Sequence, residues 1–148
     1  MEFAQVLTNG ATGNILGRGT LILGGEGLTN EGDLALSNGQ TDVFGDVANQ
    51  TTGRVIISSN SDVTFWDDVS DNGMLFHVHT GSSATFFGTT RFGIDGGGDV
   101  YLEADVTPGS SPGLETFGGN VHFCALESRN RDRRHRTRRR IRRAQCAG

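Results

Sequence analysis

The chain has 148 residues, of which 23 are glycine, two are proline and none is lysine. Its hydrophobic content of 34% is low for a compact globular domain but suits a thin solenoid, in which only the inward positions of each turn are apolar. No apolar run approaches the about 18 residues of a transmembrane helix, so we expect no membrane span.

The net charge of −4 is unevenly divided along the chain. Up to Cys124 there are 15 acidic residues and three arginines, a net charge of −12. From Ala125 onward ten arginines face two acidic residues, a net charge of +8. An acidic body is expected to repel nucleic acid and anionic membranes, so only the tail is a candidate for binding them.

Residues 1–26 predict an irregular first turn of the fold. The chain begins without the basic start and apolar stretch of a secretory signal, so we expect this chain to lack a signal peptide. The first strong strand signal covers residues 20–23 and is closed by Gly24 and Gly25.

Residues 27–98 contain three copies of one pattern. Aromatic residues recur at positions 44, 66 and 87, a spacing near 21 residues, and a glycine followed by apolar alternation precedes each of them. In the first copy we predict a strand at Leu34–Leu36, a polar turn over 37–40 and a second strand over 41–47. No segment shows the spacing of an amphipathic helix.

A unit of this length cannot bury its own apolar row, so it must stack on its neighbours and share a continuous core. We therefore predict an all-β fold, a right-handed parallel β-helix (β-solenoid) with turns of about 21 residues. The alternative is an antiparallel β-sandwich, since turn signals every 8 to 12 residues or so also fit that fold.

Closing strands are predicted over residues 99–124, which completes a β-solenoid domain of residues 1–124. A double Pro-Gly turn at 107–113 interrupts the strands there, because proline donates no N–H. Cys124 and Cys146 lack the spacing of a zinc site and are interpreted as unrelated thiols.

Residues 125–148 predict an arginine-rich disordered tail. If this tail belongs to the true protein sequence, we expect it to be an arm that binds the phosphate backbone of nucleic acid. A reading-frame slip is the alternative: one back-translation of residues 127–148 reads in the next frame as an acidic strand-turn-strand sequence. The candidate phosphate-binding residues are Arg133, Arg134, Arg136, Arg138, Arg139 and Arg140.

Four segments carry a resemblance to known proteins: residues 28–32, 41–47, 65–69 and 107–113. They resemble bacterial secreted repeat proteins, similar to autotransporter passenger and adhesin-like β-helix proteins, which often end in a PEP-CTERM type sorting segment. The resemblance covers about residues 15–123. It implies an architecture and a secreted or cell-surface location rather than a reaction, and it implies that this chain is an internal piece of a longer protein.

Acidic residues supply the candidate catalytic and calcium-binding groups. Asp67, Asp68 and Asp71, with Arg54 or Arg91 nearby, are the set that a polysaccharide-degrading β-helix or a structural calcium ion would use. The competing interpretation is that these aspartates cap turns and accept backbone N–H bonds. We expect no cofactor, with structural calcium as the exception to be tested.

Histidine and aromatic residues supply two further candidates. His77 and His79 share one face of a strand and would hold a transition metal if an adjacent turn added a third ligand such as Asp99. Adjacent aromatic residues in each copy predict one ring in the core and one outside, so that Trp66 and Phe87 form an exposed row for stacking against glycans.

These observations predict a non-catalytic structural or adhesin-like segment of a secreted or cell-surface repeat protein. A carbohydrate-binding or polysaccharide-degrading β-helix is the first alternative, and nucleic-acid binding through the tail is the second. Expected partners are extracellular matrix or surface glycans and other copies of the chain, which would meet through exposed solenoid ends.

Overall fold

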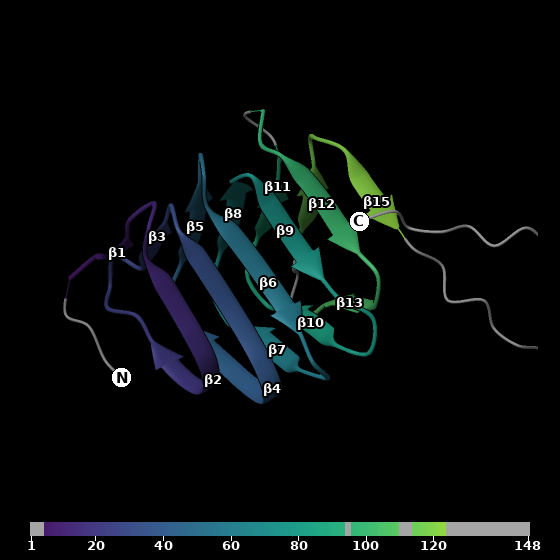
Figure 1. The fold of residues 1–148 in the computed structure, drawn as a ribbon, viewed down its shortest axis with the longest axis horizontal. Coiled ribbons are helices and arrows are strands. Elements are labelled where there is room, and N and C mark those ends of the chain that lie inside the picture. Colours follow the sequence, from purple (N-terminus) through teal and green to yellow (C-terminus); the bar gives the residue numbers. More distant parts are fainter. Residues whose placement is uncertain (1–4, 94–95, 110–113, 124–148) are drawn as a thin grey trace, which may run out of the picture.

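The computed structural model describes residues 5–93, 96–109 and 114–123, which fold as a parallel β-solenoid of about five turns spaced by about 21 residues (Figure 1). All strand pairs in this part of the chain are parallel, so the alternative of an antiparallel sandwich is wrong. The described residues include no helix, and therefore none long enough to cross a membrane. The predicted tail and both cysteines lie outside the described residues.

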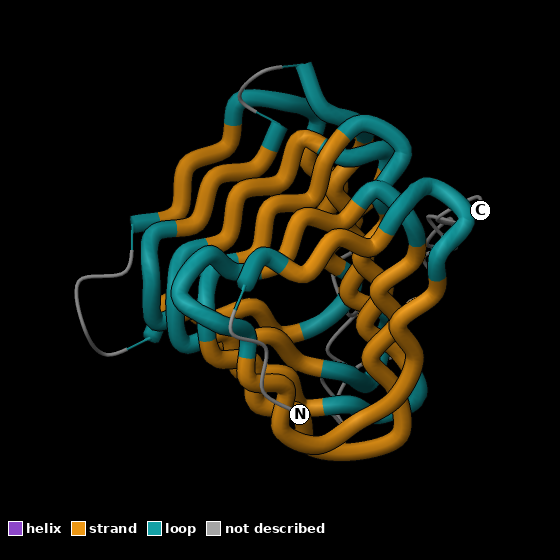
Figure 2. The backbone as a smooth tube through the Cα atoms, turned by 90° about the vertical axis from the view of Figure 1, so that its left-hand side faces the viewer, coloured by secondary structure: helices purple, strands orange, loops and turns teal. Residues whose placement is uncertain are grey.

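The strands of successive turns form three faces, and Figure 2 shows the chain coiling around a single axis. The first face consists of β1 (Leu7–Asn9), β3 (Leu28–Asn30), β5 (Val47–Gln50), β8 (Val69–Asn72), β11 (Thr90–Phe92) and β14 (Glu115–Phe117). The second face consists of the first parts of β2 (Asn14–Ile22) and β4 (Asp33–Phe44), followed by β6 (Arg54–Ser58), β9 (Leu75–Val78), β12 (Asp99–Leu102) and β15 (Val121–Phe123). The third face consists of the second parts of β2 and β4, followed by β7 (Asp62–Phe65), β10 (Ser83–Phe86) and β13 (Asp105–Pro108).

The prediction of two strands per repeat was wrong, because the chain makes a further corner after Phe44. β4 ends at Phe44 and β5 begins at Val47, with Gly45 between them at a φ of 99°. Glycine favours that backbone conformation. The chain makes the same corner at Asp67 in the next turn, between β7 and β8, so the strand predicted over 41–47 is divided by a corner of the coil that does not require glycine. The turn predicted over 37–40 is a bend within β4, where Asn38 has a φ of 65°.

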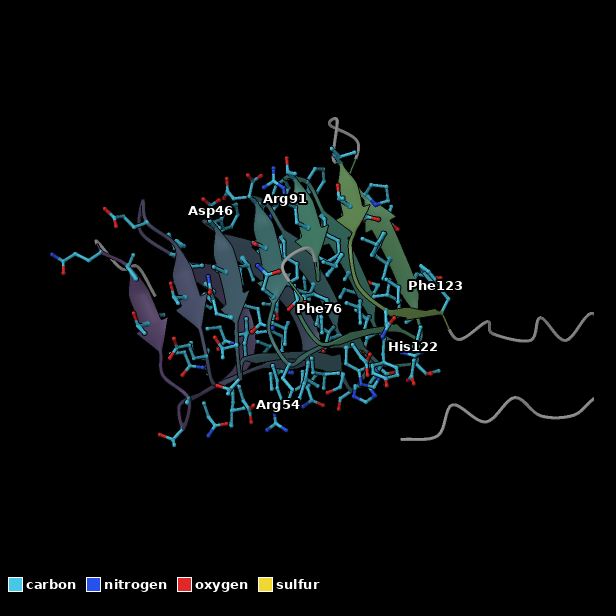
Figure 3. All side chains as sticks on the ribbon, turned by 90° about the horizontal axis from the view of Figure 1, so that it is seen from above. Asp46, Arg54, Phe76, Arg91, His122 and Phe123 are labelled. Carbon is cyan, nitrogen blue, oxygen red and sulfur yellow. The ribbon has the colours of Figure 1, made fainter. Side chains whose placement is uncertain are left out.

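The interior is filled by side chains at alternate positions of the strands. Because neighbouring turns are in register, these side chains form columns along the axis, such as Leu34, Val55, Phe76 and Val100. Phe76 is fully buried and lies in the middle of the coil in Figure 3. The core is thus continuous along the solenoid, as expected for units that stack rather than fold alone.

A polar ladder runs through this interior at the ends of the first-face strands. Asn9, Asn30, Asn49 and Asp71 occupy equivalent positions in successive turns, and all four are buried. The side-chain amide of each asparagine donates to the side-chain oxygen of the next residue, over 2.7, 2.7 and 2.6 Å. In the following turn the equivalent residue is Phe92, so the ladder ends at Asp71.

Candidate functional site

Two of the predicted acidic residues hold the corner between the third and first faces. Asp67 Oδ2 accepts a hydrogen bond from the Gly45 N–H at 2.7 Å, and Asp68 Oδ1 accepts one from the Thr89 N–H at 2.7 Å. Each aspartate therefore joins its own turn to a neighbouring one through a backbone donor. These contacts match the turn-capping interpretation of the two residues.

Asp71 lies in the interior rather than beside Asp67 and Asp68. Its side chain is 1% exposed and accepts the amide of Asn49. Burial raises the pKa of Asp71, while hydrogen bonds from the Asn49 side chain and the Gly73 backbone oppose that rise. The three aspartates thus do not converge on one outer groove, which is the arrangement that a calcium ion or an acid-base pair would need.

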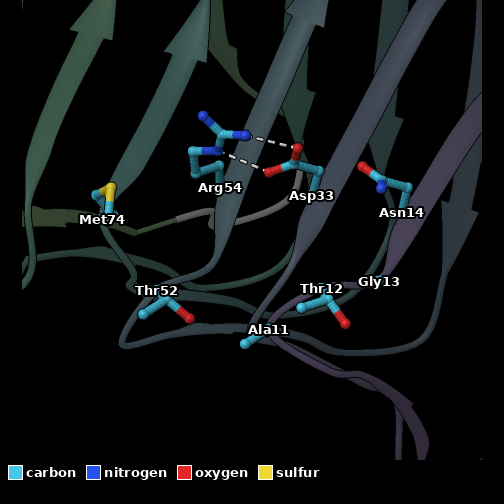
Figure 4. A pocket seen from close by; sticks show the side chains of 8 residues that line it. All are labelled: Ala11, Thr12, Gly13, Asn14, Asp33, Thr52, Arg54 and Met74. Atoms are coloured by element: carbon cyan, nitrogen blue, oxygen red, sulfur yellow. Dashed lines mark hydrogen bonds and ion pairs between the residues drawn. The ribbon is translucent and has the colours of Figure 1, made fainter.

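Arg54 forms an ion pair with a carboxylate that sequence reasoning did not select. Its Nε and Nη2 donate to the two carboxylate oxygens of Asp33, one turn earlier, both at 2.6 Å (Figure 4). This hydrogen bonding lowers the pKa of Asp33. The pair borders an open hollow of about 310 Å³, whereas Arg91 lies on the opposite side of the coil (Figure 3). Both arginines are exposed on the outside of the coil, whereas Asp71 is buried inside it.

The exposed aromatic row lies on the outer side of the third face. Trp66 is 41% exposed, and its ring is parallel to those of Phe44 and Phe87 at centroid distances of 5.6 and 4.5 Å. Phe65 and Phe86, the other members of the two aromatic pairs, lie in the core and stack at 5.1 Å.

This stacking limits how the row can meet a glycan. Both faces of the Trp66 indole are covered by Phe44 and Phe87, and a Cβ on Gly109 would collide with the Phe87 ring. The row therefore presents ring edges to solvent, together with the Trp66 Nε1–H that donates to Asp42 at 3.1 Å. Stacking of a sugar on a ring face, the usual mode for Trp, is not offered by Trp66. Phe44 also points outward, because its neighbour Val43 takes the inward position.

His77 and His79 lie together on the outside of the second face, as their spacing predicts, and the third group beside them is Glu103. Glu103 Oε2 is 3.3 Å from His77 Nε2 and 3.8 Å from His79 Nδ1. The predicted third ligand, Asp99, instead faces His122 at 3.6 Å. Burial lowers the pKa of His79, the neighbouring His77 lowers it further, and Glu103 opposes both effects.

Sequence reasoning missed the polar ladder, although the sequence contains a signal for it. Each of the four turns of the ladder places Asn or Asp two positions after an apolar residue and ahead of a glycine, as in Leu28-Thr29-Asn30 before Gly32. A Cβ on the corresponding Gly53 would collide with the Asn30 carbonyl and the Asn49 side chain, so glycine is required where the ladder passes the corner. The predicted phosphate-binding arginines lie outside the described residues.

Comparisons with known proteins found no matching family model, no similar curated protein and no similar solved structure.

Proposed function

We propose that this chain is a non-catalytic structural or adhesin-like segment of a secreted or cell-surface repeat protein. The observation that carries the proposal is the use made of the polar residues that repeat along the axis. Asn30 and Asn49 bond one turn to the next inside the coil, and Asp67 and Asp68 do so at its corner. Side chains that hydrogen-bond neighbouring turns in this way are not available as an acid-base pair. The same hydrogen bonds make the solenoid a spacer that resists local unfolding.

Two residues of the aromatic row support contact with matrix or surface glycans as a second candidate. Trp66 and Phe87 expose ring edges beside the half-buried Asp42, which accepts the Trp66 Nε1–H through one of its two carboxylate oxygens. A surface of this kind suits weak, repeated contacts along a fibre more than a single deep site. Nucleic-acid binding remains tied to the arginine-rich tail.

The proposal includes association of chains end to end, since the solenoid presents strand edges. Among the described strands, β13, β14 and β15 each pair on one side only. In the pairing of β14 with β11, the Thr90 N–H donates to the Leu114 carbonyl, so the Glu115 N–H points away from β11 toward the open edge. Such edges are templates for pairing with another chain.

The test is sedimentation velocity over a range of protein concentrations. We expect the unmodified chain to self-associate and Glu115→Pro, which lacks the edge donor, to shift the distribution toward monomer. Glu115→Ala is the matched control: it removes the same carboxylate but keeps the N–H, and should associate like the unmodified chain.

The contrary result combines two observations. The first is that the chain stays monomeric at all concentrations. The second is that it releases reducing ends from a panel of polysaccharides and that Asp68→Asn abolishes this reaction. Together they would contradict the structural proposal and support the enzymatic alternative.

A further inference from the structure

The cluster of His77, His79 and Glu103 joins two successive turns of the solenoid. His77 lies in β9 and His79 directly follows that strand, where its N–H donates to the Ile57 carbonyl. Glu103 directly follows β12 in the next turn, where its N–H donates to the Val78 carbonyl. The three side chains are therefore carried by backbone that is itself paired within the stacked sheet, which gives the cluster a rigid support.

The separations of Glu103 Oε2 from one nitrogen of each histidine fit a single small cation. One ligand atom from each residue lies within 4.8 Å of the others. Ligand bonds of about 2.0–2.1 Å in a tetrahedral site put neighbouring donor atoms roughly 3.4 Å apart. The distances of 3.3 and 3.8 Å from Glu103 Oε2 to the two imidazole nitrogens are close to that value.

One of these nitrogens is buried and has no hydrogen bond. His77 Nε2 is inaccessible to solvent, and its 3.3 Å approach to Glu103 lacks the alignment of a hydrogen bond. A buried polar atom without a partner is costly, so its position next to two further donors needs an explanation. A cation held between the three groups would supply the missing partner.

The donor types identify the class of ion. Two imidazoles and one carboxylate favour divalent first-row transition metals such as Zn²⁺ and Co²⁺, whereas Ca²⁺ and Mg²⁺ require mainly oxygen ligands. His79 is 42% exposed, so one side of the cluster is open to solvent and to an entering ion. Three protein ligands also leave a fourth position for water.

We propose that His77, His79 and Glu103 bind one divalent transition-metal ion, which clamps two adjacent turns together. The clamp joins the turn of β9 to the turn of β12, and the polar ladder inside the coil ends at Asp71 in the former. Metal binding would therefore add a cross-turn link at the place where the internal one stops.

The test uses Co²⁺ as a spectroscopic probe and Zn²⁺ as its competitor, on the full-length chain without a histidine tag. Cys124→Ser, His135→Ala and Cys146→Ser in the background remove the thiol and imidazole ligands at the C-terminal end of the sequence. We expect one equivalent of Co²⁺ to bind with the absorption of a low-coordinate site, Zn²⁺ to displace it, and Zn²⁺ to raise the unfolding temperature.

Two ligand variants and one control decide the assignment. His79→Ala and Glu103→Gln should each weaken Co²⁺ binding by at least about ten- to hundredfold. That is the loss seen at other metal sites when a residue that only hydrogen-bonds a ligand is removed. His122→Ala, a histidine on the same face that lies beside Asp99, should bind like the background chain. Circular dichroism verifies that each variant is folded. Absence of binding, or binding that survives in both ligand variants, would overturn the proposal.

Discussion

Replacing Asn49 with alanine is expected to lower the free energy of unfolding by about 3 kcal/mol, the largest effect that we predict for a polar side chain. Asn49 is fully buried, accepts the amide of Asn30 and donates to Asp71. Truncation removes the bond from the Asn30 amide, which keeps its bond to the Gly32 carbonyl, and the bond to Asp71, whose buried oxygen loses a donor. A buried polar group that loses its partner costs about 1–3 kcal/mol. Loss at one step of the ladder thus affects two neighbouring turns.

Urea denaturation followed by circular dichroism measures this difference. Gln50→Ala is the control, because Gln50 is the next residue of β5 and is exposed, and such a change is usually within about 0.5 kcal/mol. A loss for Asn49→Ala no larger than that of Gln50→Ala would show that the ladder does not hold the turns together.

Replacing Asp71 with asparagine is expected to stabilise the protein at neutral pH, by on the order of 1 kcal/mol or more. Burial raises the pKa of Asp71 in the folded chain above its ordinary value. As the pH rises, the unfolded chain therefore releases this proton first, at a pH of about 3.9, and the folded chain releases it only at higher pH. Stability is lost over that interval and is not regained at neutral pH.

The Asp71→Asn variant has no proton to lose at this position, and a site for its amide is available. The amides of Asn30 and Asn49 donate to the carbonyls of Gly32 and Gly53, and Gly73 is the equivalent residue for position 71. From acid to neutral pH, the unfolding free energy of the unmodified chain should show a fall relative to that of Asp71→Asn. Asp105→Asn, an exposed change in β13, should retain the fall. Equal profiles for all three proteins would contradict the assignment to Asp71.

The solenoid could be predicted from the sequence because its alternation and its repeat agree. Inward residues such as Val55, Phe76 and Val100 recur in register, and a stack of turns is the arrangement that buries them all. The number of strands per turn was harder to predict from the sequence. It depends on the corner at Gly45 and at its equivalent Asp67, where strand-forming side chains stand on both sides of the corner.

The candidate site was predictable only in part, because the turns differ in length. Position 77 pairs with Tyr101, 24 positions later, so that Glu103 rather than Asp99 lies beside His79. A uniform spacing of 21 residues would pair position 77 with position 98 instead. The ladder was missed for a different reason: Asn and Asp beside glycine are typical of exposed turns, and only the stacked structure shows that they bond to one another inside.

Cross-linking of two outward residues tests the stacking of turns most directly. Thr64 in β7 and Thr85 in β10 are register partners, and neighbouring strands are about 4.8 Å apart, within the Cα separation of about 4.4–6.8 Å that a disulfide spans. With Cys124 and Cys146 replaced by serine, Thr64→Cys combined with Thr85→Cys should close an intramolecular disulfide under mild oxidation. The pair Thr64→Cys and Thr107→Cys, two turns apart, should remain reduced. Closure of the second pair, or failure of the first, would contradict the stacked parallel solenoid.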